Sequence, residues 1–181
     1  MKKFNNIAWS YEEIQQHSLE LEKRVKERTA ELKQSEAKMK AQYKGIPVPT
    51  YTWQGTKNDI RLVDYNDAAV KISRGGIKKY VGITAKEMYH DNPDILNDLN
   101  LCFKKKKTIE REMPYLFKST GEIKYLAVKY AFVLPDLVLV HTEDITQRKK
   151  ADENLREANV RLQEADQQTH SNYQHPKKIL S

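Results

Sequence analysis

The sequence predicts an α+β domain: a five-stranded antiparallel sheet with short helices on one face, flanked by long helices at both ends of the chain. Five β-prone segments occur, two early and three late, with helix-forming segments between the two groups. Long stretches without glycine or proline lie towards both ends. Charged residues make up 31% of the 181 residues, which is high for a compact globule and indicates helices outside the core.

The N-terminal segment is expected to form one long helix. Ser10 and Glu13 have the spacing of a capping box, and neither glycine nor proline follows before Gly45. Two interpretations stay open: a single amphipathic helix packed on its own domain, or a parallel dimer helix that shifts register. Polar residues interrupt the heptad seam, which is formed by Ile14, Leu21, Val25, Leu32 and Met39.

The early part of the domain is expected to be a hairpin followed by short helices. Residues 50–54 and 60–65 are β-prone, and a turn-like loop of about five residues joins them. The helical segments are expected at 68–73, where Asn66 or Asp67 can cap, at the capping box Thr84–Glu87, and from Pro93 to about Lys106.

The late part is expected to contain three strands, at 108–118, 122–133 and 137–142. In the first two, apolar side chains fall on both faces of the sheet, and such a sheet needs cover on both sides. The helices between the strands can cover one face. The flanking helices or a second copy of the chain must then cover the other.

After Thr146 the chain is expected to be helical again, with a second heptad seam that includes Leu155 and Leu162. The seam fades by Thr169, so we expect residues 170–181 to be an irregular tail or the remainder of a severed linker. The predicted organisation is an N-terminal helix over residues 1–44, a domain over 45–145, and a linker helix with its tail over 146–181.

Composition and motifs argue against catalysis, metal binding and nucleic-acid binding. The net charge of +7 divides over these three segments as +3, +2 and +2, so no basic face or tail stands out. The single cysteine excludes an internal disulfide framework, and the five histidines lack metal-ligand spacing. Glycine-rich phosphate loops, HExxH helices and nucleophile elbows are also missing. We therefore expect no catalytic residues, no metal ligands and no direct contact with nucleic acid.

The chain is expected to be cytoplasmic and to make no membrane contact. Its first residues include two lysines but no apolar segment of a secretory signal. No stretch of the sequence has the apolar length needed to span a bilayer.

Residues 143–151, Glu-Asp-Ile-Thr-Gln-Arg-Lys-Lys-Ala, resemble the Asp-Ile-Thr motif that closes PAS domains, the sensory modules of bacterial and archaeal signalling proteins. The resemblance covers roughly residues 44–151 and includes the run Val-Gly-Ile-Thr-Ala-Lys-Glu-Met at 81–88. Residues 21–32, LEKRVKERTAEL, are similar to the linkers that precede PAS domains in sensor histidine kinases. The resemblance implies a PAS fold with flanking signalling helices, and it favours the dimer-helix interpretation of the N-terminal segment.

In the PAS family this motif joins the last strand to an output helix, which implies roles for four residues. Asp144 and Thr146 set the junction, Ile145 anchors it in the core, and Arg148 pairs with a nearby acid. A core strand that runs almost directly into a charged helix would couple the interior of the domain to whatever follows.

PAS cavities lie between the sheet and the central helices, and the resemblance implies a ligand pocket there. The simpler interpretation of each candidate is a packed core side chain. The candidates are Trp53, Val63, Leu99, Cys102, Phe103, Tyr115, Tyr125 and Val140.

We expect no tightly held coloured cofactor. Flavin-binding PAS domains carry an Asn-Cys-Arg step, whereas Cys102 lies in Asn-Leu-Cys-Phe-Lys. Haem-binding PAS domains place a histidine on the central helix, and residues 94–107 contain none. An unidentified small-molecule ligand stays open.

The resemblance predicts a non-catalytic sensory and relay module of a multidomain signalling protein. It would act as a parallel homodimer on an output domain outside this chain, such as a histidine kinase or a DNA-binding domain. Two alternatives remain: a dimerisation or scaffold module without a ligand, and the regulatory part of a transcription factor.

Overall fold

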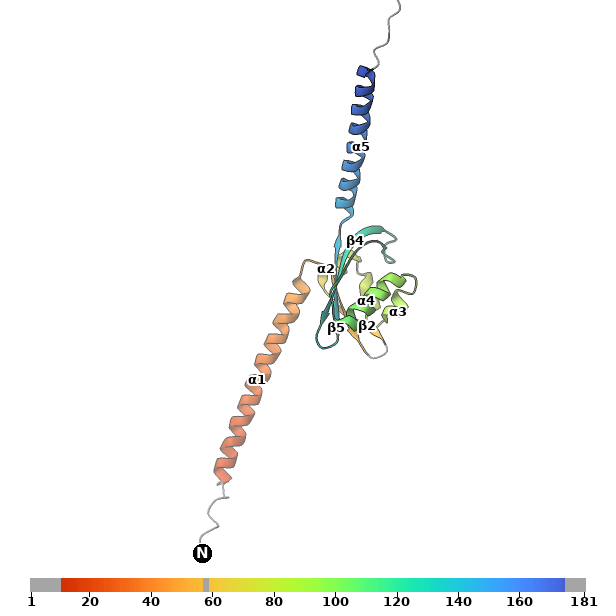
Figure 1. Ribbon diagram of the computed structural model, residues 1–181. Helices are drawn as coiled ribbons and strands as arrows, with labels where there is room; N and C mark the ends of the chain where they lie inside the picture. Colours follow the sequence, from red (N-terminus) through yellow and green to blue (C-terminus); the bar gives the residue numbers. More distant parts are fainter. Residues whose placement is uncertain (1–10, 57–58, 175–181) are drawn as a thin grey trace, which may run out of the picture. The chain divides into compact units, whose positions relative to one another are not determined.

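The computed structural model describes residues 11–56 and 59–174, which form the expected α+β fold (Figure 1). The chain divides into two compact units, one up to Gly45 and one from Ile46 onward. The first contains helix α1 (Tyr11–Gly45), which ends at the expected glycine. Ser10, the predicted cap of this helix, lies outside the described residues. The apolar seam residues of α1 are all exposed: Ile14, Leu21, Val25, Leu32 and Met39.

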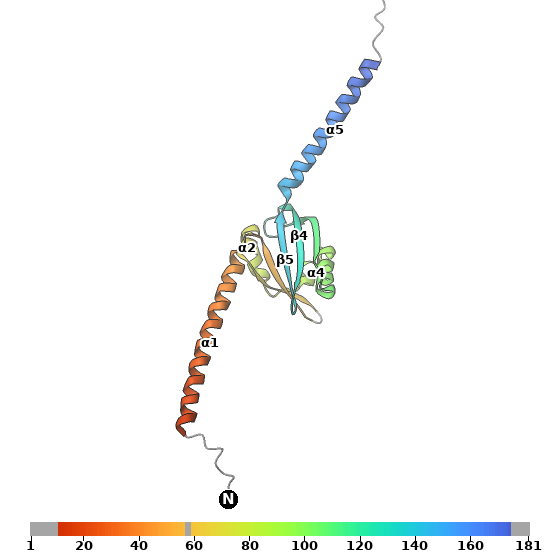
Figure 2. The ribbon, with the colours of Figure 1, turned by 60° about the vertical axis from the view of Figure 1, so that its left-hand side comes forward.

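The second unit contains the predicted five-stranded sheet, and every pair of neighbouring strands is antiparallel. The strand order is β2-β1-β5-β4-β3, so the last strand lies at the centre of the sheet (Figure 2). The strands are β1 (Thr50–Gly55), β2 (Ile60–Tyr65), β3 (Ile109–Leu116), β4 (Ile123–Val133) and β5 (Leu137–Asp144).

Short helices cover one face of this sheet, as the sequence predicts (Figure 1). Asn66 caps the first, because its side-chain oxygen accepts a hydrogen bond from the Ala69 amide. The predicted capping box between Thr84 and Glu87 is also confirmed. The 3₁₀ turn is the one segment here that no sequence signal predicted. The elements are α2 (Asp67–Ile72), the 3₁₀ turn η1 (Gly76–Tyr80), α3 (Ala85–Met88) and α4 (Pro93–Lys105).

Strand β4 shows how the two faces of the sheet differ. Leu126, Val128 and Tyr130 are buried on the face that packs against α4. Ile123 and Tyr125 point to the opposite face and are 68% and 43% exposed. The core therefore lies between the sheet and the short helices, and apolar side chains remain exposed on the second face.

The C-terminal end of the domain differs from the sequence prediction in two respects. Strand β5 continues to Asp144 instead of ending at Thr142, because residues 142–144 still pair with β4. Helix α5 (Thr146–Gln174) continues five residues beyond the predicted start of an irregular tail. That prediction was wrong for residues 170–174, where loss of the apolar seam does not break the helix. Residues 175–181 lie outside the described part of the chain.

Across the described helices, none combines sufficient length with the apolar character required to cross a membrane.

Candidate functional site

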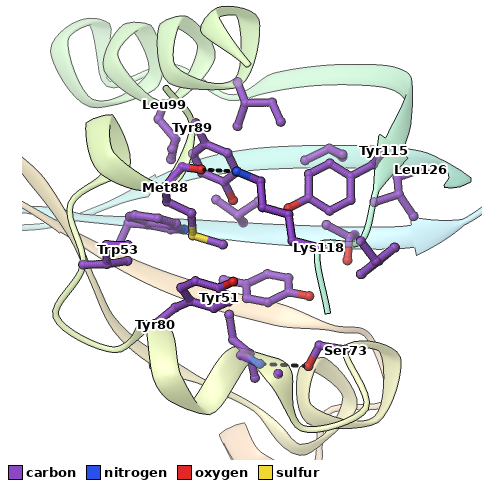
Figure 3. A pocket seen from close by; sticks show the side chains of 18 of the residues that line it. Tyr51, Trp53, Ser73, Tyr80, Met88, Tyr89, Leu99, Tyr115, Lys118 and Leu126 are labelled. Carbon is purple, nitrogen blue, oxygen red and sulfur yellow. Dashed lines mark hydrogen bonds between the residues drawn. The ribbon is translucent and has the colours of Figure 1, made fainter. Parts of the chain in front are cut away.

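A cavity of about 290 Å³ lies between the inner face of the sheet and the short helices (Figure 3). Residues of four strands, β1, β3, β4 and β5, contribute to its wall, together with residues of η1, α3 and α4. Seven tyrosine, tryptophan and phenylalanine side chains contribute to the lining: Tyr51, Trp53, Tyr80, Tyr89, Tyr115, Phe117 and Tyr130.

The aromatic rings form packed pairs around this cavity. The ring of Trp53 lies 5.7 Å from that of Tyr89, and Tyr115 meets Phe117 edge to face at 5.0 Å. Figure 3 shows Tyr51, Tyr80 and Tyr115 arranged around one common space. Rings in such contacts form a wall that suits a flat apolar ligand.

The tyrosines of the lining are held in their neutral form. Burial raises the pKa of Tyr115 to about 12, and the neighbouring Tyr80 adds to the shift. Burial also raises the pKa values of Tyr51, Tyr89 and Tyr130. Each of these groups therefore keeps its proton at neutral pH and can donate a hydrogen bond.

The charged side chains of the lining are engaged with other groups of the chain. Lys118 Nζ lies 2.9 Å from Asp91 Oδ2 and donates to the carbonyl oxygen of Met88 at 3.3 Å (Figure 3). Glu87 accepts hydrogen bonds from the amide and the hydroxyl of Thr84, which lower its pKa. Both of these charged groups therefore already have a partner within the chain.

Four of the eight predicted pocket residues line this cavity, namely Trp53, Leu99, Tyr115 and Val140. They come from β1, α4, β3 and β5, so the fold brings together positions up to 87 residues apart in sequence, from Trp53 to Val140. That they bind a ligand stays a prediction.

The other four predicted residues, Val63, Cys102, Phe103 and Tyr125, do not line the cavity. Strand alternation explains Val63 and Tyr125, which are 38% and 43% exposed beside inward-facing neighbours. Cys102 is fully buried in the core outside the lining, where burial raises its thiol pKa. Phe103 is half-buried and packs against Phe132.

Several lining residues were missed by reasoning from the sequence. Tyr80 and Tyr89 come from η1 and from the residue after α3, where no periodic pattern assigns a face. Alternation along β4 places Tyr130 on the same face as Leu126 and Val128, but it does not show that this face is the inner one.

The second candidate site is the junction where β5 passes into α5. Ile145, the one residue between these elements, is buried, and its amide donates to the carbonyl oxygen of Tyr125 at 2.9 Å. The Tyr125 amide donates in turn to Thr146 Oγ1 at 3.0 Å. The backbone of β4 therefore holds both Ile145 and the first residue of α5.

Asp144 completes this junction through its carboxylate. Its two oxygens accept hydrogen bonds from the Thr146 amide at 3.0 Å and from Lys124 Nζ at 2.8 Å. Burial alone would raise the pKa of Asp144, but the bonds from Lys124 and Thr146 outweigh it and lower the pKa to about 2.

The first turn of α5 is also tied to β3. Arg148 forms an ion pair with Glu112, and Lys149 Nζ lies 2.7 Å from the other oxygen of the same carboxylate. The two cations lower the pKa of Glu112. Arg148 thus has an acidic partner of the kind that the sequence predicts.

Neither site has the geometry of a metal centre. Within residues 11–56 and 59–174, no three His, Cys, Asp or Glu side chains are grouped so that they could hold a metal ion.

Comparison with solved structures identifies the fold. A PAS domain of an HTR-like protein from Haloarcula marismortui aligns with a TM-score of 0.53 at 18% identity, over 66% of this chain and 99% of that one. An RNA-binding light-oxygen-voltage (LOV) receptor aligns with a TM-score of 0.55 at 12% identity. That match covers 77% of this chain but only 38% of the receptor. A LOV protein from Rhodobacter sphaeroides aligns with a TM-score of 0.51 at 13% identity, over 60% of this chain and 66% of that one.

The domain therefore has a PAS-like fold, in the class that also contains LOV domains. No protein-family model matches the sequence, and no curated protein matches it either.

Proposed function

We propose that this chain is a PAS sensory and relay module that binds a small ligand or partner and transmits the signal through its linker helices. It has no catalytic step of its own in this proposal, and it acts in the cytoplasm on an output domain outside the chain. A histidine kinase or a DNA-binding domain is the kind of output that the linker helices suit.

The observation that carries the proposal is that the cavity and the junction share two strands. On β5, Val140 and Thr142 line the cavity, and Asp144 binds the first amide of α5. On β4, Leu126 lines the cavity, and the neighbouring Tyr125 holds Ile145 and Thr146 through its backbone. A change in the filling of the cavity would act on the same strands that hold the helix.

The physical mechanism is a shift between two packings of the domain. A ligand shifts such an equilibrium only by its difference in affinity for the two states, so it must contact residues that move. The shared strands provide those contacts, and the short connection through Ile145 leaves little slack before α5. Movement of a strand would therefore pass to the helix as a displacement of its first turn.

Apolar residues on both linker helices support a parallel homodimer. The α1 seam is exposed along its length, and in α5 Leu155 and Leu162 are 63% and 64% exposed. Heptad positions of this kind are normally buried against a partner helix. A second copy of this chain would bury them, and a dimer would carry a helix displacement to both output domains.

The test is the output of the full-length protein that contains this chain. Asp144→Ala should leave the domain folded and abolish the stimulus-dependent change in output. Asp136→Ala is the matched control, because it removes an aspartate just before the other end of β5. The Asp136 carboxylate accepts a hydrogen bond from Gln54 Nε2 at 3.0 Å and lies away from the junction. An unchanged response in Asp144→Ala would refute the relay.

Native mass spectrometry and sedimentation of freshly purified protein test the other parts of the proposal. A retained small molecule and a dimer mass are expected. A dimer that never retains or binds a small molecule would favour the scaffold function instead.

A further inference from the structure

The cavity lining includes a tyrosine whose buried hydroxyl group has no partner among the described residues. Tyr130 on β4 lines the cavity and is 1% exposed. Among the described residues, its hydroxyl group has no hydrogen-bond partner. A buried hydroxyl without a hydrogen bond is unfavourable, so a ligand that accepted a hydrogen bond from it would recover part of that cost.

The two charged groups that act on the pKa of Tyr130, Asp98 and Arg111, are bonded to each other. Arg111 Nε donates to Asp98 Oδ2 at 2.6 Å, and Arg111 Nη2 donates to Asp98 Oδ1 at 2.9 Å. Burial is the main cause that raises the pKa of Tyr130. The negative charge of Asp98 raises this pKa further, and the positive charge of Arg111 partly opposes the rise. The phenol is therefore held protonated and acts as a donor.

The size of the cavity limits the ligand to about two fused rings. An apolar cavity of about 150 Å³ accommodates benzene. The volume here, about 290 Å³, is close to twice that value. Rings such as Trp53, Tyr89 and Tyr115 line the space, so a flat molecule would make the most contact with the wall.

The charges in the lining argue for an uncharged ligand. Lys118 is paired with Asp91, and Glu87 is bound within its capping box to Thr84. A charged ligand would lose its hydration without gaining a free counter-ion from these groups, and such desolvation opposes binding.

We propose that the cavity binds an uncharged bicyclic aromatic molecule whose carbonyl oxygen accepts a hydrogen bond from the hydroxyl of Tyr130. The inference rests on the proposed sensory function and specifies the ligand class of that site.

The test is an NMR titration of methyl-labelled methionines. Met88 and Met113 line the cavity, whereas Met39 lies on α1 and serves as an internal control. Three probes share one skeleton: 1-indanone has the carbonyl, indane lacks it, and indane-1-carboxylate is charged. We expect 1-indanone to shift the Met88 and Met113 signals, leave Met39 unchanged, and bind about tenfold more tightly than either other probe.

Tyr130→Phe isolates the hydrogen bond. It should remove the roughly tenfold advantage of 1-indanone and leave the affinity for indane unchanged. Tyr125→Phe, which removes a hydroxyl from the exposed face of the same strand, should change neither affinity. The methionine spectrum of each unliganded variant shows whether it is folded.

Three results would overturn the inference. Equal affinities for 1-indanone and indane, unaffected by Tyr130→Phe, would exclude the hydrogen bond but leave a ligand-binding cavity. Tightest binding of the carboxylate would exclude an uncharged ligand. Unchanged Met88 and Met113 signals with all three probes would exclude this ligand class. The proposed sensory function is tested separately, by the stimulus-dependent output of the Asp144→Ala variant of the full-length protein.

Discussion

The charge of Asp144 should stabilise the domain measurably, and the effect should depend on pH. Asp144→Asn removes the charge but keeps an acceptor for the Thr146 amide. The fall in pKa from 3.8 to about 2 corresponds to about 2.4 kcal/mol at 1.36 kcal/mol per unit. Because the Asp144 side chain is 34% exposed, solvent screening reduces the expected loss to about 1–2 kcal/mol.

The sign of the pH dependence follows from the depressed pKa. The folded protein binds the proton less readily than the unfolded chain, so the contribution is complete well above pH 3.8 and is lost as the pH falls through about 2. At pH 3, roughly half of the contribution should remain. Urea unfolding of the wild type and Asp144→Asn at pH 7 and pH 3 measures this difference.

Glu143→Gln is the control for this prediction, because it removes a negative charge from the adjacent residue. Its free energy of unfolding should differ from the wild type by less than about 0.5 kcal/mol at both pH values. An Asp144→Asn effect that is the same at pH 3 as at pH 7 would refute the role of the charge. The role of the charge would also be refuted if Asp144→Asn lowered the free energy of unfolding by no more than Glu143→Gln does.

Two further substitutions test the packing of the domain by urea unfolding. Asn66→Ala should cost about 3 kcal/mol, because the buried side chain accepts from the Thr50 and Ala69 amides and donates to two carbonyls. A loss below about 1 kcal/mol would contradict this. Gly55→Ala should cost about 1–3 kcal/mol, because its Cβ would lie 2.0 Å from the Phe103 ring. Adding Phe103→Leu should recover part of that loss, and failure to do so would place the strain elsewhere.

Local patterns predicted the elements of this fold well. The hairpin β1–β2, the cap at Asn66 and the capping box at Thr84 each depend on neighbouring residues, so the sequence alone contains their signals. The end of β5 was less well predicted, because its last residues are held by pairing with β4 and not by their own propensity. Pairing across the sheet is a tertiary effect that a single strand does not reveal.

The cavity was only half predictable for a related reason. Alternation along β4 separates Tyr125 from Leu126, but it does not say which of the two sets faces the helices. The apolar residues of α4 recur at helical spacing, which indicates that Leu99 and Cys102 are buried. This spacing does not show that Leu99 lines the cavity and that Cys102 does not. Which buried residue borders empty space depends on the volumes of all its neighbours.

The bonds at the junction could not have been derived from the sequence. The motif at 144–146 indicates a boundary between strand and helix, but the bonds that hold it come from the backbone of Tyr125, 21 residues before Thr146. Only the register of β4 against β5, in which Leu126 pairs with Asp144, brings these groups together.

Amide hydrogen exchange at the junction tests the coupling between cavity and helix most directly. Val140→Phe fills the cavity from β5, and Leu139→Phe adds the same ring to the adjacent residue, on the other face of the strand. The coupling predicts that Val140→Phe changes the protection of the amides at residues 145–149 by about fivefold or more, roughly 1 kcal/mol, and that Leu139→Phe does not. Changes confined to the cavity wall, with the amides of Ile145 and Lys149 unaltered, would contradict it.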